Sequence, residues 1–274
     1  MEHPEDTFEF DRATALTRVA DERFSGDIHP GWDINGNANG GYLLAMAGSA
    51  MRTASGRPDP ISVTAHYLAP GAAGPVEITT GAVKAGRQLS TMTGSMRQGE
   101  RELLRVLGTF GDVTAGRGGF EHIVGRPPDL PPIDECVMRQ PNLAAVTINI
   151  AKRLKIWLRP GDAMFQLGHK SGTALIEGWL GFVDDRPIDT LALLLAVDAF
   201  PPPVFNIDMP PGWVPTVELT AHVRGVPAPG PVRCRFRTDF VQNGFLQEDG
   251  EVWDSAGLLV AQSRQLGMVP RVSA

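Results

Sequence analysis

The sequence has few cysteines, no excess of basic residues and no long hydrophobic run. Lys and Arg total 25 against 31 Asp and Glu, giving a formal net charge of −6, and without a basic patch we expect no nucleic-acid partner. Cys136 and Cys234 are the only cysteines, and the acidic N-terminus shows no secretory signal, so we expect reduced thiols in a cytoplasmic protein. The longest apolar run, Leu191 to Val197, is too short to cross a bilayer, which predicts no membrane insertion.

Several well-known catalytic motifs are also missing. The chain contains no Gly-x-Ser-x-Gly elbow, no His-Glu-x-x-His, no Gly-x-Gly-x-x-Gly and no P-loop. Its six His and two Cys show no metal-ligand spacing, so we expect neither a metal nor a cofactor. The hydrophobic content of 42% and charged content of 20% are ordinary globular values. A chain of 274 residues therefore has room for two domains of ordinary size or for one large one.

What the chain does contain is an internal repeat. Val63-Thr64-Ala65-His66 recurs as Leu219-Thr220-Ala221-His222, an offset of 156 residues. At the same offset, Gly74-Pro75-Val76 recurs as Gly230-Pro231-Val232. Reactive polar residues are found in the second copy only. We therefore expect two related units that build one site, with the first copy supporting the second.

The first copy combines a buried helix with antiparallel strands. A loop of Asn and Gly at 35–41 precedes a helix of small and apolar residues over 42–51. From 61 to 111, strand-length segments are separated by Gly and Pro turns, as in an antiparallel sheet.

The second copy follows the same order. Strand-like segments over 144–158 and 174–183 precede an apolar helix over 188–200, and three prolines at 201–203 end that helix. Strands then run from 216 to the C-terminus.

The aperiodic Pro- and Gly-rich stretch between the copies is interpreted as a stiff spacer. We expect an N-terminal domain at 1–112, a linker at 113–143 and a C-terminal domain at 144–274 that carries the catalytic residues. The predicted fold class is α+β. A sheet wrapped around one central helix, twice over, is a double hotdog arrangement.

Asp198 is the first polar residue that needs an explanation. Helical spacing places it on one face with Leu191, Leu194 and Leu195. A carboxylate that continues an apolar stripe is costly unless it is hydrogen-bonded or does chemical work. A structural role at the proline corner, or a solvated helix end, accounts for Asp198 equally well on spacing alone. The corresponding helix of the first copy contains no acid.

Thr216 opens a strand of the second copy. Alternation places it on one face with Glu218, Thr220 and His222, whereas its repeat counterpart, Pro60, has no hydroxyl. The β-propensity of threonine is a sufficient alternative explanation for this residue.

Gln265 lies in the last strand. It shares a face with Ala261 and Ser263, whereas Gln262 and Arg264 point the other way. An inward amide with a partner is one interpretation, and an exposed glutamine at a sheet edge is the other.

These residues resemble those of the TesB-like acyl-CoA thioesterases (the acyl-CoA thioesterase II family), which are double hotdog proteins, over nearly the whole chain. The Arg of the family's Leu-Arg-Pro-Gly turn is replaced here by Ala69. The segments that carry the resemblance are Asn39-Gly40-Gly41, Tyr67-Leu68-Ala69-Pro70-Gly71, Gly86-Arg87-Gln88-Leu89-Ser90, Leu195-Ala196-Val197-Asp198-Ala199-Phe200, Pro215-Thr216-Val217-Glu218-Leu219-Thr220 and Ala261-Gln262-Ser263-Arg264-Gln265-Leu266-Gly267.

The resemblance implies hydrolysis of acyl-CoA to a carboxylic acid and CoA, in fatty acid or lipid metabolism. The family's three catalytic residues fall on Asp198, Thr216 and Gln265. Asp198 would act as general base on a water held by the other two. Gly41 is a candidate donor to the oxyanion. Acyl-CoA is the expected partner, and exposed sheet edges are compatible with a homo-oligomer.

Two other functions are compatible with the same fold. A hotdog enoyl-CoA hydratase or dehydratase would pair an acid with a His, and His222 could approach Asp198 in space. A non-catalytic acyl-CoA-binding protein would retain the fold without the reaction. Release of free thiol from acyl-CoA separates hydrolysis from both.

Overall fold

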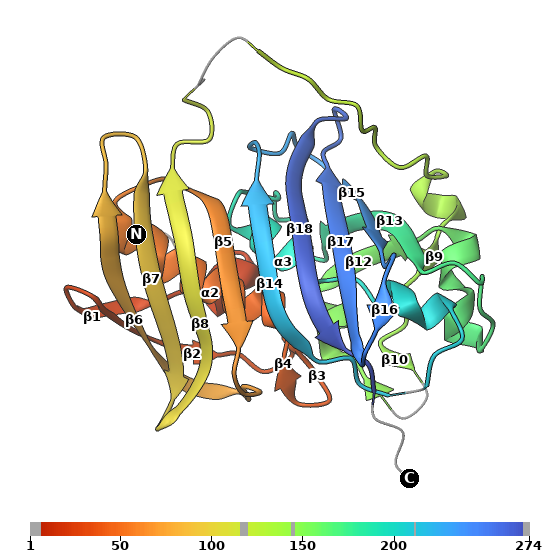
Figure 1. Cartoon of the computed structure of the whole chain (residues 1–274), viewed down its shortest axis with the longest axis horizontal. Helices are drawn as coiled ribbons and strands as arrows, with labels where there is room; N and C mark the ends of the chain where they lie inside the picture. The colour runs from red at the N-terminus through yellow and green to blue at the C-terminus, as the bar shows by residue number, and fades with distance from the viewer. Residues whose placement is uncertain (1–6, 116–119, 144–145, 211, 271–274) are drawn as a thin grey trace.

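The computed structural model of the chain describes residues 7–115, 120–143, 146–210 and 212–270. Its main feature is one 14-stranded sheet whose neighbouring strands run antiparallel (Figure 1). From edge to edge the strands are β1 (Thr17–Ala20), β2 (Arg23–Ile28), β6 (Gly74–Ala85), β7 (Ser90–Gln98), β8 (Arg101–Gly111), β5 (Asp59–Tyr67), β14 (Thr216–Val223), β18 (Leu259–Met268), β17 (Phe245–Trp253), β15 (Val232–Arg237), β13 (Leu175–Phe182), β12 (Leu154–Leu158) and β9 (Val137–Met138), with β16 (Val241–Gln242) paired to β17.

The remaining elements are short, apart from one helix. Two small ribbons pair β3 (Asp33–Ile34) with β4 (Asn37–Ala38) and β10 (Asn142–Leu143) with β11 (Val146–Thr147). The helices are α1 (Glu9–Ala13), α2 (Gly40–Ser55), α3 (Ala192–Ala196), η2 (Ile133–Glu135), η3 (Asn149–Lys152), η4 (Pro160–Leu167) and η5 (Pro203–Asn206). None of the helices in the described ranges is long and apolar enough to span a membrane.

The two copies of the repeat meet at the centre of the sheet. β5 pairs with β14 so that Thr64 lies opposite Thr220, its own counterpart in the repeat. The two threonine Oγ1 atoms are 2.8 Å apart and hydrogen-bonded. Because β5 pairs with β14, its counterpart in the repeat, the sheet continues from one half of the chain into the other. One buried hydrophobic cluster likewise spans both halves.

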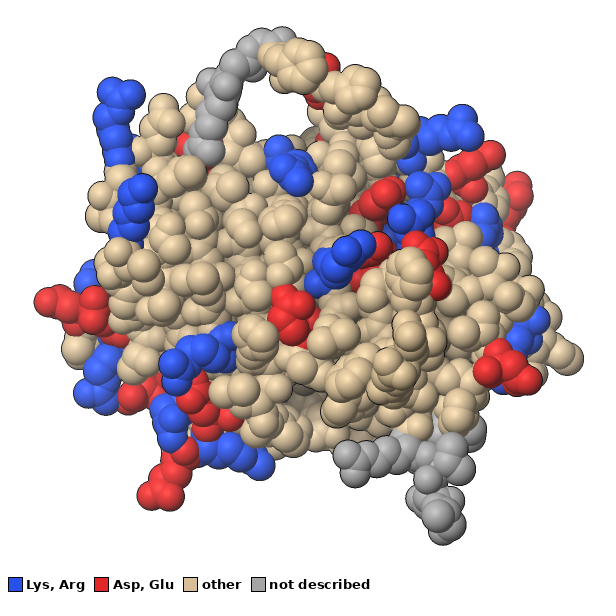
Figure 2. Space-filling view, viewed as in Figure 1, with Lys and Arg blue, Asp and Glu red and all other residues tan. Residues whose placement is uncertain are grey.

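The middle of the outer face of the sheet is more highly charged over the second half of the chain than over the first. Figure 2 shows acidic and basic side chains mixed over β15, β17 and β18, and a nearly uncharged surface over β5, β7 and β8. Arg264 Nε lies 2.6 Å from Asp249 Oδ1, and Arg235 Nη1 lies 3.2 Å from Glu251 Oε2. The positive charges of these two arginines are therefore matched by neighbouring carboxylates.

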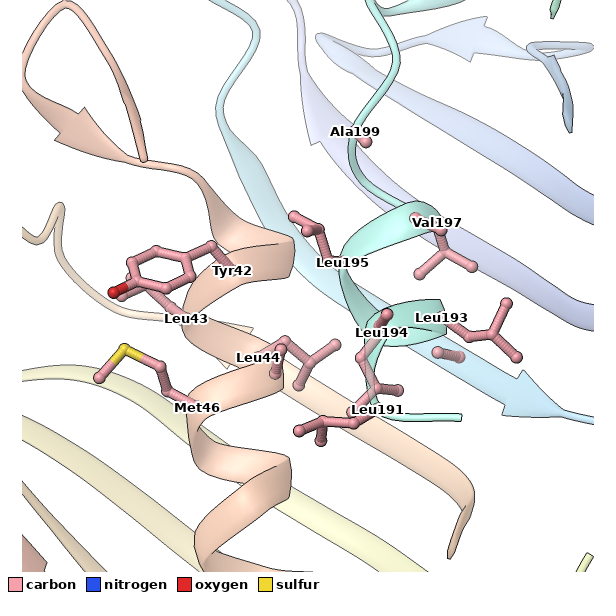
Figure 3. Packing of buried hydrophobic residues seen from close by; sticks show 14 of the residues in the cluster. Tyr42, Leu43, Leu44, Met46, Leu191, Leu193, Leu194, Leu195, Val197 and Ala199 are labelled. Carbon is pink, nitrogen blue, oxygen red and sulfur yellow. The ribbon is translucent and has the colours of Figure 1, made fainter. Parts of the chain in front are cut away.

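Helices α2 and α3 pack together behind the sheet (Figures 1 and 3). A Cβ atom built on Gly48 of α2 would lie 2.6 Å from Leu194 Cδ1, and one on Gly41 would lie 2.9 Å from the Leu195 oxygen. Ala45 lies between these glycines on the same face and is fully buried. The small residues of α2 therefore have a packing reason, because they let the α3 backbone approach closely.

The second helix is shorter than the sequence predicts. The sequence predicts a helix over 188–200, but α3 is regular only over Ala192–Ala196. Asp189 Oδ1 accepts the Ala192 N–H at 2.8 Å, so the regular helix begins there. At the other end, the Asp198 N–H bonds to the Leu195 oxygen at 3.0 Å, three residues back, which is a tightened final turn. Asp198 thus follows the helix rather than lying within it.

Part of the predicted linker joins the sheet. Within 113–143, Val137–Met138 form the edge strand β9, in which Met138 lies opposite Trp157 of β12. Residues 144 and 145, where the second domain was predicted to begin, lie outside the described residues, as do 116–119 of the linker.

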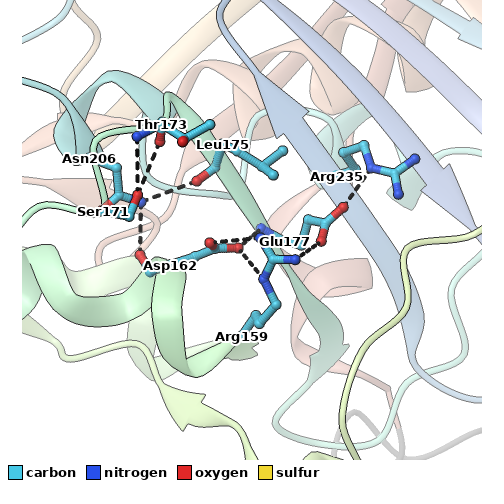
Figure 4. Close-up of polar contacts among 8 residues, drawn as sticks. All are labelled: Arg159, Asp162, Ser171, Thr173, Leu175, Glu177, Asn206 and Arg235. Atoms are coloured by element: carbon cyan, nitrogen blue, oxygen red, sulfur yellow. Dashed lines mark hydrogen bonds and ion pairs between the residues drawn. The ribbon is translucent and has the colours of Figure 1, made fainter.

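A buried charged network fixes η4 to the sheet (Figure 4). Arg159 forms ion pairs with Asp162 at 2.9 Å and with Glu177 at 2.7 Å, and Glu177 also pairs with Arg235 at 2.6 Å. Asn206 adds a hydrogen bond to the Asp162 carbonyl at 3.0 Å. Both carboxylates are buried, and paired opposite charges offset much of the cost of their desolvation. We interpret the network as structural.

Candidate active site

Asp198 lies where the two copies of the repeat meet. Its Oδ2 atom accepts hydrogen bonds from the Gly41 N–H at 2.7 Å and from Asn39 Nδ2 at 3.1 Å. Asn39 Nδ2 also donates to the Asp198 carbonyl at 3.0 Å. The two donors come from the first half of the chain and the carboxylate from the second, so both halves build this site.

The start of α2 explains these contacts. Asn39 is the N-cap of the helix, and its Oδ1 accepts the Tyr42 N–H at 2.9 Å. The Gly41 N–H is one of the first amides of the helix, which have no partner within it. Asp198 supplies that partner, and the positive end of the helix dipole favours its negative charge.

The close approach of Asp198 requires glycine in the first turn of α2. A Cβ on Gly41 would lie 2.8 Å from Asp198 Cβ, and one on Gly40 would lie 3.0 Å from both Asp198 Oδ2 and Tyr67 Cε1. Any larger residue at these positions would displace the carboxylate.

We therefore expect Gly41→Ala to lower kcat on the order of 100-fold, because the added methyl group moves Asp198 from its position. Steady-state kinetics on acyl-CoA measures the effect. Gly161→Ala is the matched control, since a Cβ on Gly161 meets nothing within 4 Å. Equal rates for the two variants would contradict this role of Gly41.

Burial makes Asp198 a stronger base than an ordinary aspartate. Desolvation raises its pKa from 3.8 to about 6, although the Gly41 N–H, Asn39 and the charge of Arg139 each lower it. The residue is only half-buried by surface area, so solvent can still reach it. A pKa near 6 keeps the carboxylate ionised at neutral pH and able to accept a proton.

Arg139 is a buried cation near this carboxylate. It is 7% exposed, and its Nη1 donates to the carbonyl of Ala199 at 2.5 Å, next to Asp198. Burial lowers the pKa of Arg139 to about 10, and the Asp198 charge acts to raise it. Arg139 is therefore still charged at neutral pH, and it stabilises the ionised form of Asp198.

Replacing Arg139 with Met should move the acidic limb of the pH–rate profile to higher pH by about one unit, because Asp198 loses a positive charge that lowers its pKa. Arg139→Lys keeps the charge and should leave the limb nearer its original position. The measurement is kcat/KM for acyl-CoA against pH. An unshifted limb in Arg139→Met would show that this charge does not act on the base.

Thr216 lies on the inner face of the sheet, and its predicted orientation was wrong. Alternation placed it with Glu218, but a bulge in β14 shifts the pairing, so that Thr216 lies opposite Gly267 and Glu218 opposite Leu266. Opposite residues share a face, and Gly267 is on the buried face with Gln265. One extra residue thus turns Thr216 toward the side covered by α2 and α3.

Gln265 points inward, as one of its two interpretations predicted. It is 6% exposed and lies opposite Leu219 on one side and Glu248 on the other. Its Oε1 atom is buried and has no hydrogen-bond partner among the described residues.

Within the described residues, no hydrogen bond joins Asp198 to Thr216 or Gln265. The charge of Asp198 acts on two other side chains, Tyr67 and Glu248. Tyr67 donates its hydroxyl to the Gly40 carbonyl at 3.0 Å, and both burial and Asp198 raise its pKa. Glu248 is buried opposite Gln265, and its pKa is raised by burial and then by Asp198. The grouping of Asp198, Thr216 and Gln265 into one site therefore stays a prediction.

His222 does not approach Asp198. It lies on the outer face of β14 with Thr220 and opposite Gln262, on the side of the sheet away from α3. The sheet therefore separates it from the carboxylate. In the part of the chain that the structure describes, no three His, Cys, Asp or Glu side chains gather as a metal site requires.

Sequence reasoning missed four residues of this region: Asn39, Tyr67, Arg139 and Glu248. Only Asn39 carried a usable signal, since an Asn before a helix predicts an N-cap. That signal does not predict the bond to Asp198, which lies 159 residues away.

Comparisons with known proteins identify the family of the chain. Two family models match the chain: the acyl-CoA thioesterase N-terminal domain over residues 28–111, and the acyl-CoA thioesterase C-terminal domain over residues 127–269. The chain belongs to the acyl-CoA thioesterase family. It is a thioester hydrolase, and the resemblance inferred from its motifs is confirmed.

Solved structures show the fold of this thioesterase. A provisionally assigned thioesterase II from Thermobifida fusca YX is 30% identical, has a TM-score of 0.85 and covers 97% of this chain and 99% of its own. A protein of unknown function with a hotdog fold from Alicyclobacillus acidocaldarius is 23% identical and has the same TM-score. The match covers 97% of this chain and 100% of that protein. The acyl-CoA thioesterase II TesB2 from Mycobacterium marinum is 16% identical, with a TM-score of 0.73 and coverage of 96% and 99%.

A relative by sequence is an uncharacterised protein of Mycobacterium tuberculosis (strain ATCC 25618 / H37Rv). It is 29% identical over 266 residues, which are 90% of this chain and 91% of the relative. The likeness thus extends over almost the full length of both proteins, and the hotdog fold is confirmed by the structural neighbours.

Proposed function

We propose that this thioesterase hydrolyses acyl-CoA to a carboxylic acid and CoA, with Asp198 as general base and with Thr216 and Gln265 holding the attacking water. The observation that carries the proposal is the state of the Asp198 carboxylate. Oδ2 is held by Asn39 and Gly41, whereas Oδ1 accepts no hydrogen bond from any described residue. One oxygen is fixed and the other is available to water.

In the first step Asp198 Oδ1 takes a proton from water while the water oxygen forms a bond to the thioester carbon. The carbonyl electron pair moves to oxygen and gives a tetrahedral oxyanion. In the second step the oxyanion electron pair re-forms the C=O bond as the C–S bond breaks, the sulfur leaves with the bonding electrons, and the proton held by Asp198 passes to the thiolate. Base catalysis of this kind contributes about 10²–10⁴-fold.

Gly41 has a different part in this scheme from the one the sequence suggested. Its N–H donates to Asp198 Oδ2, so we propose that it positions the base. A role as oxyanion donor stays a prediction. Gln265 and Thr216, both on the inner face, would hold the water and supply polar contacts to the reacting carbonyl.

We also propose that the fold comprises two tandem hotdog domains. The pairing of Thr64 with Thr220 and the separate family matches to the two halves support this division. The free thiols of Cys136 and Cys234 support a reducing, cytoplasmic location. Fatty acid or lipid metabolism is the setting that an acyl-CoA substrate suggests.

The test is to incubate the purified protein with acyl-CoAs of short to long chain and to follow release of free thiol. Turnover would give the chain preference directly. Absence of turnover with every acyl-CoA would leave the family assignment in place and overturn the proposed substrate class.

A further inference from the structure

A second buried acid lies behind the proposed site. Glu248 of β17 is directly opposite Gln265 of β18, and the two side chains are 7% and 6% exposed. Opposite residues of an antiparallel pair have Cβ atoms about 4.5–5.5 Å apart, so their polar ends can meet. The mechanism above gives Glu248 no role.

A hydrogen bond between the two side chains would satisfy a buried acceptor of Gln265. Gln265 Oε1 is buried without a partner, and an orphaned acceptor costs about 1–3 kcal/mol. A carboxylate cannot satisfy a carbonyl oxygen, because both only accept. A protonated carboxyl carries an O–H and can donate to it.

We propose that Glu248 is a positioning residue whose carboxyl O–H donates to Gln265 Oε1 and thereby fixes the amide with its N–H groups toward the reacting water. The proposal rests on the proposed function for the role of Gln265. It adds a residue that never touches the substrate and acts through Gln265 alone.

The groups facing Glu248 favour its protonated form. Burial is the largest cause of its raised pKa, followed by the charges of Asp198 and then Asp249. Asp249 points to the outer face, where Arg264 and Arg237 lower its own pKa, so it remains ionised. The negative charges of Asp249 and Asp198 both oppose the ionisation of Glu248. Across the sheet, Gln265 brings no charge to offset this.

Ionisation of Glu248 sets the direction in which the rate should change with pH. The raised pKa of Glu248 favours its protonated form, whereas Asp198, with a pKa of about 6, is ionised at neutral pH. Raising the pH far enough ionises Glu248, removes the donor and repels the Asp198 carboxylate. Any loss of rate from this ionisation should therefore appear on the alkaline side of the profile.

The first test is a double-mutant cycle on kcat. Glu248→Met keeps the apolar stem and removes the donor, and should lower kcat on the order of 10-fold to 100-fold with little change in KM. Glu248→Gln retains N–H donors and should recover most of that loss. In a Gln265→Met background, Glu248→Met should have no further effect. Equal losses with and without Gln265 would overturn the proposal.

The second test does not depend on activity. At about pH 8, where Asp198 is ionised, the infrared difference between wild type and Glu248→Gln should contain the C=O stretch of a protonated carboxylic acid. Carboxylate bands instead would overturn the proposal. If Asp198→Asn and Gln265→Met both turn over normally, the proposed function fails, and with it the positioning role; the infrared band then reports only the hydrogen bond.

Discussion

Replacing Asp198 with Asn should lower kcat for acyl-CoA hydrolysis by about 10²–10⁴-fold, because the amide cannot accept the proton of the attacking water. The fold should survive the change. Both observed hydrogen bonds end on one oxygen, Oδ2, and the amide oxygen of Asn can accept the same two bonds from Asn39 and Gly41. Free thiol release measures the rate, and circular dichroism checks the fold.

Thermal unfolding of the same variant gives an independent control. The folded-state pKa of Asp198 is raised from 3.8 to about 6, so the folded protein binds this proton more tightly than the unfolded chain. Its contribution to stability is therefore lost as the pH rises from about 4 to about 6, at about 1.4 kcal/mol per unit of pKa difference. Asp198→Asn does not lose this stability, because its amide does not ionise, and it should have a higher Tm than the wild type at pH 8. A folded variant with normal turnover would show that Asp198 is not the base.

Replacing Asn39 with Asp should have the second large effect. The new carboxylate can still cap α2 through the Tyr42 N–H, but it puts a second acid about where Nδ2 now lies, 3.1 Å from Asp198 Oδ2. Two carboxylates at this separation cannot both ionise freely, so the pair takes up a proton with a strongly raised apparent pKa. The rate at pH 7 should fall about 10-fold or more and should recover in part as the pH rises.

Asn39→Ser is the matched control for that variant. Serine keeps the N-cap and removes the donor to Asp198 without adding charge. Its acidic limb should lie between those of the wild type and Asn39→Asp. Coincident profiles for the two variants would mean that charge repulsion is not the cause.

The internal repeat predicted the centre of the fold. Local periodicity predicted the remaining helices and strands only in part. The pairing of Thr64 with Thr220 joins the very segments that the repeat identified. The length of α3 was overestimated because apolar composition does not reveal where backbone bonds tighten beside Asp189 and Asp198. The edge strand Val137–Met138 was missed because two residues carry no periodicity.

Within the site, the sequence indicated candidate residues more readily than it indicated their orientation and contacts. Alternation left two interpretations of Gln265 open, an inward amide and an exposed sheet-edge glutamine, and its burial decides for the inward amide. Thr216 was placed on the wrong face because a one-residue bulge reverses alternation and leaves no mark in the sequence. The contacts of Asp198 with Asn39 and Arg139 depend on how distant segments pack. Neither contact has a local pattern that could predict it.

The most direct test of the account is the pH dependence of kcat/KM for acyl-CoA hydrolysis by the wild-type protein and by Asp198→Asn. A single buried carboxylate as base predicts a rate that rises with pH through an apparent pKa near 6 and then levels off. The residual rate of Asp198→Asn should lack this limb. A wild-type profile that is flat between about pH 5 and 7, or an unchanged limb in the variant, would contradict the assignment of Asp198 as the base.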